Sequence, residues 1–128
     1  MSGDTVREHM TPSPHTIGRD QPLDRASAVM RERKIRHLPV LEGGQLLGIL
    51  SVRDVYLIEP LQDVDPAQVT VEEAMTAEPY AVAPDASLKE VVTTMAAKKY
   101  GAAVVMEGRK VAGIFTTIDA LKVLSDRL

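Results

Sequence analysis

The amino-acid sequence repeats itself at an offset of 65 residues, which brings Thr5 onto Thr70. The opening phrase TVREHMTPSP aligns with TVEEAMTAEP, and further on LPVLEGGQLLGILSVRD aligns with AVVMEGRKVAGIFTTID. No insertion or deletion separates the two phrases in either copy. A gap-free register of this length is hard to obtain by chance, so the chain is a tandem duplication and its fold has to be built twice.

The composition restricts the class of protein. The chain has 128 residues, of which 45% are apolar and 26% charged, as in a globular protein of about one ordinary domain. No run approaches the roughly 18 consecutive apolar residues of a membrane-spanning helix. The first residues, MSGDTVREHM, lack the basic start and apolar stretch of a secretory signal. We therefore expect a cytoplasmic protein with no membrane partner.

Charge and cysteine content exclude several kinds of chemistry. Fifteen basic and 18 acidic side chains give a net charge of −3, which does not favour binding to nucleic acid. The absence of cysteine excludes disulfides, thiol catalysis and thiolate metal sites. The spacing of His9, His15 and His37 matches no usual metal site, so none is predicted. No phosphate-loop motif and no nucleophile with a neighbouring base is present, so we expect no enzyme activity.

Each half has the same predicted order of elements, βαββα, after a short helical turn. The turn is followed by a short strand, an amphipathic helix, a strand pair joined by a glycine-containing turn, and a final helix. In the first half these elements are expected at 6–10, 15–18, from Leu23, at 38–41, at 45–50 and from Ser51. In the second half they are expected at 71–75, 80–83, from Leu88, at 102–106, at 110–115 and from Thr116.

This pattern predicts an α+β fold of two pseudo-symmetric halves. A unit of about 60 residues buries too little surface to be secure alone, so we expect the halves to pack sheet to sheet around one shared core. With aromatic residues at only 3%, that core has to be aliphatic. The expected boundaries are 5–59 for the first domain, 60–69 for the linker and 70–128 for the second domain.

The clearest local motif is a glycine, two apolar residues, a hydroxyl residue, two variable residues and an aspartate. It occurs as Gly48 to Asp54 and again as Gly113 to Asp119. It places a hydroxyl and a carboxylate at a helix N-terminus, where unpaired amides favour a polar or anionic ligand. The same spacing is also that of a capping box, in which both side chains satisfy the helix's own amides. Recurrence of the motif in both halves favours the ligand role without excluding the cap.

The two halves resemble a tandem pair of CBS domains, the regulatory units named after cystathionine β-synthase. The resemblance rests on the phrases VREHMTPSP and VEEAMTAEP, the strand Ile35–Val40, the glycine turns and both copies of the glycine-to-aspartate motif. It extends from about Thr5 to Leu128. It implies a disc-like module with two clefts that bind adenine nucleotides or related adenosyl compounds, the aspartate taking the ribose hydroxyls.

The resemblance also implies which residues line each cleft. The adenine is expected against main chain and apolar side chains of the first short strand and the second strand, and the ribose and phosphate at the helix start. The first cleft would use Thr16, Ile17, His37, Leu38, Pro39, Ser51 and Asp54. The second would use Ala81, Val82, Ala102, Ala103, Val104, Thr116 and Asp119.

The two clefts are not expected to be equivalent. The first half carries Arg36, His37 and Arg53 where the second carries Gly101, Ala102 and Ile118. Because phosphate needs positive charge or aligned donors, the first cleft is predicted to take the phosphorylated ligand better. The second is predicted to suit an adenosine-like group or to stay empty.

These observations lead to two competing functions. The first is a regulatory module that senses AMP, ADP, ATP or a related ligand, requires no cofactor and signals to a regulated protein or to its own oligomer. The second is a constitutive interaction or dimerisation module in which both aspartates only cap helices. A homodimer is implied by the resemblance, and apolar residues near the ends of the last helices offer a surface for it.

Overall fold

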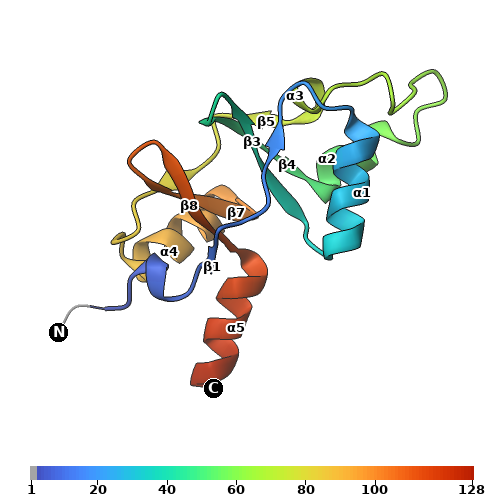
Figure 1. Cartoon of the computed structure of the whole chain (residues 1–128). Helices are drawn as coiled ribbons and strands as arrows, with labels where there is room; N and C mark the ends of the chain where they lie inside the picture. The colour runs from blue at the N-terminus through green and yellow to red at the C-terminus, as the bar shows by residue number, and fades with distance from the viewer. Residues whose placement is uncertain (1–2) are drawn as a thin grey trace. The chain divides into compact units, whose positions relative to one another are not determined.

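The protein, in a computed structural model that describes residues 3–128, forms two compact units (Figure 1). One unit, here called the central unit, is continuous and comprises His15–Pro79. The other, here called the terminal unit, joins the residues up to Pro14 to Tyr80–Leu128. Each unit contains one four-stranded sheet, so the α+β class predicted from the duplication is confirmed.

The sheet of the central unit has the order β2-β3-β4-β5. Its strands are β2 (Ile17–Gly18), β3 (His37–Glu42), β4 (Gln45–Ser51) and β5 (Thr76–Ala77). The β2 and β3 strands are parallel, as the crossover through a helix requires, and the other pairs are antiparallel. The predicted hairpin between β3 and β4 is confirmed.

Three helices belong to the central unit: α1 (Leu23–Arg33), α2 (Val52–Ile58) and α3 (Val71–Ala74). Apolar positions of α1 recur at helical spacing and are buried, whereas its last turn is charged and exposed, as predicted for a solvated end. The residues after α2 contain no regular element before α3, yet the amide of Leu23 at the start of α1 donates to the carbonyl of Val69 at 2.7 Å. The expected linker is therefore anchored to the central unit.

The terminal unit repeats this plan. Its sheet has the order β1-β8-β7-β6 and contains β1 (Thr11–Pro12), β8 (Lys110–Thr116), β7 (Ala102–Glu107) and β6 (Ala81–Val82). Its helical elements are η1 (Val6–Glu8), a 3₁₀ turn, with α4 (Leu88–Lys98) and α5 (Thr117–Arg127). No helix of residues 3–128 is both long enough and apolar enough to cross a lipid bilayer.

Each unit has a hydrophobic core of its own, in which the apolar faces of its helices pack against its sheet. The further expectation of a core shared between the halves stays a prediction. The central core contains Ile17, Leu23, Ala26, Met30, Leu38, Val40, Leu50, Val55 and Val71. The terminal core contains Val6, Leu88, Val91, Met95, Ala103, Val105 and Phe115. As predicted, both cores are almost entirely aliphatic.

The segment that opens each repeat belongs to the compact unit that carries the other repeat. The β1 strand pairs antiparallel with β8, with Thr11 opposite Ile114, and the two lie side by side in Figure 1. In the central unit β5 pairs in the same way with β4, with Thr76 opposite Ile49. These two short strands were not predicted, and their pairing crosses from one sequence repeat to the other.

Glycine permits this close pairing in both sheets. A side-chain carbon built on Gly48 would lie 2.6 Å from the carbonyl oxygen of Thr76 and 2.6 Å from the sulfur of Met75. One built on Gly113 would lie 2.9 Å from the carbonyl oxygen of Thr11. The glycine that opens each glycine-to-aspartate motif is thus required by the neighbouring strand, independently of any ligand.

Candidate ligand-binding site

The first group of predicted site residues gathers at one corner of the central unit. His37 begins β3 opposite Ser51 at the end of β4, and Leu38 lies opposite Leu50. The amide of Val52, the first residue of α2, donates to the carbonyl of Arg36 at 2.9 Å and fixes the strand-to-helix corner. The structure therefore brings the start of β3, the end of β4 and the start of α2 together.

Burial decides which atoms of this corner a ligand can reach. Ile17 and Leu38 are buried in the central core, so their side chains are not open to a ligand and only their main chain remains. Pro39 is also fully buried. Thr16, Arg36 and Arg53 are exposed, and Ser51 and Asp54 are half-buried. The side chains of this corner that are free to contact a ligand are consequently polar.

The second group forms an equivalent corner in the terminal unit. Ala102 lies opposite Thr116, and the amide of Thr117 donates to the carbonyl of Gly101 at 3.1 Å. The parallel pairing of Ala81 with Val104 brings β6 beside β7. Three of the predicted residues, Ala102, Ala103 and Val104, are buried. Val82 packs against the terminal core, and Ala81 is exposed.

Both aspartates cap the helices that they begin. The amide of Ser51 donates to Oδ2 of Asp54 at 2.9 Å, and the amide of Asp54 donates to the hydroxyl of Ser51 at 3.1 Å. Thr116 and Asp119 form the same reciprocal pair at 2.9 and 3.3 Å. The capping-box interpretation is confirmed in both halves, as local helix physics favours. In both boxes the carboxylate accepts the cap hydrogen bond through Oδ2.

His37 supplies the one unsatisfied buried side-chain atom found among residues 3–128. Its Nδ1 has no hydrogen-bond partner. Burial lowers the pKa of this imidazole below its ordinary value, the carboxylate of Asp54 opposes the shift and the charge of Arg36 adds to it. His37 is thus held towards its neutral form, with a ring nitrogen available to a ligand atom.

Positive charge at the two corners differs as the sequence predicted. Arg36 and Arg53 are exposed beside the central corner, whereas Gly101 and Ile118 occupy the equivalent positions of the terminal unit. Exposed guanidinium groups can turn towards a phosphate without first being desolvated. The preference of the central corner for a phosphorylated ligand stays a prediction that rests on this difference in charge.

A possible metal-ligating cluster in the terminal unit was not predicted. Asp4, Glu8 and His9 bring three potential ligand atoms within 4.8 Å of one another. His9 Nε2 lies 2.8 Å from Asp4 Oδ2, and the guanidinium of Arg127 contacts the same oxygen. The hydrogen bond with His9, with a further contribution from Arg127, lowers the pKa of Asp4. Because a cation already pairs with the central carboxylate of this cluster, we assign no metal to it.

Comparison with known proteins identifies the family. The family model described as "CBS domain" matches residues 6–58 and again residues 71–126. The chain belongs to the CBS domain family. It is 28% identical over 110 residues to the CBS domain-containing protein YhcV of Bacillus subtilis, covering 86% of this chain and 78% of YhcV.

Solved CBS pairs share the whole architecture. The crystal structure of CBSX2 of Arabidopsis thaliana in complex with AMP matches with a TM-score of 0.84 and 24% identity, covering 98% of each chain. The CBS pair of protein MJ0100, in complex with 5′-methylthioadenosine and S-adenosylmethionine, matches with a TM-score of 0.85 and 22% identity, again covering 98% of each chain. These similarities show the fold and the pairing of two CBS domains.

Proposed function

We propose that this chain is a cytoplasmic regulatory module, not an enzyme, that binds an adenine nucleotide or adenosyl compound at its two corners. The observation that carries the proposal is the duplicated strand-to-helix corner, which presents the same hydroxyl and carboxylate in both units. The CBS pairs CBSX2 and MJ0100, which share this fold, were determined with AMP and with adenosyl compounds. No cofactor is required for such a role.

The caps are compatible with ligand binding because each uses one carboxylate oxygen. Oδ2 of Asp54 and of Asp119 takes the helix amide, and Oδ1 is left to accept from a ribose hydroxyl. The cap also fixes the direction of the carboxylate before the ligand arrives. A charge-assisted hydrogen bond of this kind contributes about 1.5–3 kcal/mol.

At the central corner the ligand would carry phosphate. Arg36 and Arg53 supply two exposed guanidinium groups, and the unpartnered Nδ1 of His37 supplies a further polar atom. The terminal corner has none of these and would take an adenosine-like group or no ligand. Occupancy would act by shifting the population of two arrangements, by no more than the difference in affinity of the ligand for them.

The test is calorimetric titration of AMP, ADP, ATP, NAD and S-adenosylmethionine, preceded by a thermal-shift screen. At 100 times its dissociation constant a ligand stabilises the fold by about 2.7 kcal/mol, which a melting curve resolves readily. Asp54→Ala is expected to abolish the tighter nucleotide-binding event, and Asp119→Ala to leave it in place. The opposite result would reverse the assignment of the two corners.

The chain provides a matched control for the loss of a cap. Thr70 and Glu73 form a third capping box, at the start of α3, with the amide of Thr70 donating to Glu73 at 3.1 Å. Glu73→Ala therefore removes a cap without touching either corner and is expected to leave nucleotide affinity unchanged. If none of the five ligands raises the melting temperature of the parent protein, the sensor function is wrong.

The satisfied capping boxes also favour a second candidate, a constitutive interaction module. In that case Asp54→Ala would cost stability and change no ligand response. Either function is compatible with a homodimer, because Ile118, Leu121 and Leu124 on α5 are 49%, 58% and 52% exposed. Light scattering on the parent protein and on Leu121→Lys tests the dimer, which the lysine is expected to weaken.

A further inference from the structure

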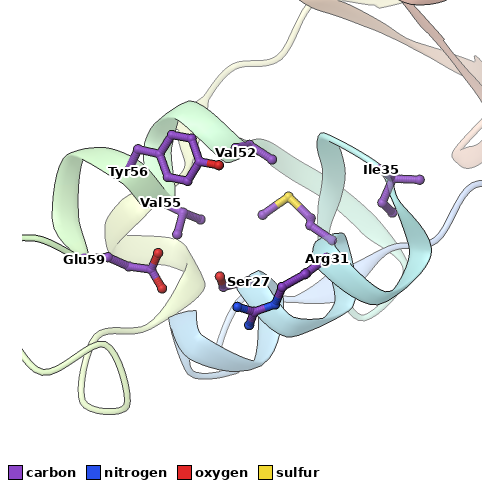
Figure 2. A pocket seen from close by; sticks show the side chains of 8 residues that line it. Ser27, Arg31, Ile35, Val52, Val55, Tyr56 and Glu59 are labelled. Carbon is purple, nitrogen blue, oxygen red and sulfur yellow. The ribbon is translucent and has the colours of Figure 1, made fainter.

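A groove lies between α1 and α2 of the central unit, and its lining includes neither Ser51 nor Asp54 (Figure 2). Its volume is about 190 Å³. The floor is apolar and consists of Met30, Ile35, Val52 and Val55, and the rim is polar and consists of Ser27, Arg31, Tyr56 and Glu59. An apolar floor under a few convergent polar groups is the usual composition of a small-molecule site.

The rim carries one charge of each sign. Figure 2 shows the guanidinium of Arg31 and the carboxylate of Glu59 on either side of the Ser27 hydroxyl, with the Tyr56 hydroxyl turned towards the groove. Within residues 3–128, neither Arg31 nor Glu59 takes part in an ion pair. Both charges are thus free to pair with complementary charges on one occupant.

The duplication shows that the fold does not require this rim. At the equivalent positions of the terminal unit, 65 residues on, Ser27 is replaced by Val92 and Arg31 by Ala96. Tyr56 and Glu59 are likewise replaced by leucine, at positions 121 and 124. Of the floor, Met30 and Val55 have apolar equivalents in Met95 and Ala120, whereas Ile35 and Val52 are replaced by Tyr100 and Thr117. Only the central unit therefore combines an apolar floor with charges of both signs.

We propose that this groove binds a free amino acid with an apolar side chain. The carboxylate of the ligand would pair with Arg31, whose planar fork fits a carboxylate with two hydrogen bonds. The ammonium group would pair with Glu59, and the Ser27 hydroxyl lies where it can bond either group. The apolar side chain would lie on Ile35 and Val52, the apolar lining residues that are only half-buried.

The size of the groove agrees with such a ligand. Pockets for drug-sized molecules begin at about 300 Å³, and the smaller volume of this groove matches a small metabolite. A simple carboxylate would leave Glu59 unpaired, and a simple amine would leave Arg31 unpaired. A zwitterion pairs with both charges. The rim therefore favours an amino acid over a simple carboxylate or a simple amine.

The experiment is an NMR titration of the full chain with L-leucine up to millimolar concentration. The amides of α1 and α2 around Ser27 and Val55 are expected to shift. Two analogues separate the charges: 4-methylpentanoate lacks the ammonium group and 3-methylbutylamine lacks the carboxylate. Each is expected to bind at least about tenfold more weakly than leucine, because each loses one charge-assisted pair.

Variants copied from the terminal unit test the rim without threatening the fold. Arg31→Ala and Glu59→Leu install the residues found at positions 96 and 124, and each is expected to weaken leucine binding at least about tenfold. Glu32→Ala, which removes an exposed charge of α1 that does not line the groove, is the matched control and should bind as the parent does. A melting curve confirms that each variant is folded.

Three results would overturn the proposal. The first is no shift with leucine at millimolar concentration. The second is binding of leucine and both analogues with equal affinity, which would mean that the rim charges do not pair with the charged groups of the ligand. The third is a change of oligomeric state in Arg31→Ala or Glu59→Leu, which would assign the groove to contact between two copies. Nucleotide binding at the Asp54 corner is measured separately and does not bear on any of these outcomes.

Discussion

The central and terminal units share the features that the fold needs and differ in the features exposed to solvent and ligands. Both have a capping box at the strand-to-helix corner. Both also have a glycine where the short strand of the opening segment packs closely against the sheet. By contrast, Arg36 and His37 of the central corner are replaced by Gly101 and Ala102. Comparing the units therefore separates residues that build the domain from residues that are free to acquire a function.

Surface ion pairs also differ between the two units, in the residue that supplies the cation. In the central unit, Arg19 pairs with Glu42 and with Glu72 of the opening segment, at 2.8 and 3.1 Å. In the terminal unit the cation lies on the opening segment itself, where Arg7 pairs with Glu107 at 2.8 Å. The position equivalent to Arg19 is a proline, Pro84. A pairing between opening segment and sheet is thus kept although the residue that supplies the cation has changed.

The largest effect is expected from filling the glycine contacts. Gly48→Ala should cost about 3 kcal/mol of unfolding free energy, since its new carbon would meet the backbone of β5, which has little room to move. Gly113→Ala should cost a similar amount, because its new carbon would meet the carbonyl oxygen of Thr11 at 2.9 Å and would lie closer still to the sulfur of Met10. Urea unfolding measures both. Gly3→Ala, which meets nothing within 4 Å, is the control, and an equal effect at all three positions would contradict the explanation.

Removal of caps should have a smaller effect of the same size in both units. Ser51→Ala and Thr116→Ala are each expected to cost about 1 kcal/mol, because each leaves one helix amide without its partner. The same change at Thr70, which caps α3, should cost a similar amount. Thr5→Ala should cost little, since Thr5 makes no side-chain cap bond at the equivalent position. A large cost at Thr5 would show that capping is not the cause.

Glycine at the helix C-termini should stabilise both units. Lys34 and Lys99 follow α1 and α4 with φ angles of 57° and 62°, in the left-handed region that suits glycine. Lys34→Gly and Lys99→Gly are each expected to raise the unfolding free energy by up to about 1 kcal/mol. Thermal denaturation tests this, and a loss of stability in either variant would mean that the lysine makes a compensating contact.

The smallest expected effect is a pH dependence confined to the central unit. The pKa of His37 is lowered in the folded protein, so the unfolded chain binds more protons below about pH 6.5, the ordinary value for histidine. Stability is therefore lost as the pH falls through that value. His37→Ala, which copies Ala102 of the terminal unit, should make the unfolding free energy less dependent on pH between about 5 and 7.5. An unchanged profile would show that His37 does not titrate abnormally.

The repeated elements could be predicted from the sequence because they leave periodic patterns. The apolar spacing of Leu23, Ala26 and Met30 indicates a buried helix face, and the hydroxyl-to-aspartate spacing indicates a cap; both are confirmed. The short strands β1 and β5 could not be predicted in this way. Each has two exposed residues, one of β1 being a proline, so no alternation marks them, and their partner strands are distant in sequence.

The candidate site was predictable only in part for a similar reason. The motif locates Ser51 and Asp54 at a helix start, but it cannot show that Leu38 is wholly buried or that the Nδ1 of His37 lacks a partner. Both depend on how closely distant segments pack. The groove rim, with Ser27 and Glu59 on different helices, likewise becomes visible only once α1 and α2 lie together.

The placement of the opening segment has a consequence for synthesis on the ribosome. The central unit is one uninterrupted stretch, His15–Pro79, and lies between β1 and the strand that β1 joins. Residues of β1 have no sheet to join until β8, which ends at Thr116, has been translated. The β1 strand must therefore stay unpaired while the whole central unit is synthesised, and it reaches its partner only after every strand of the central sheet has been made.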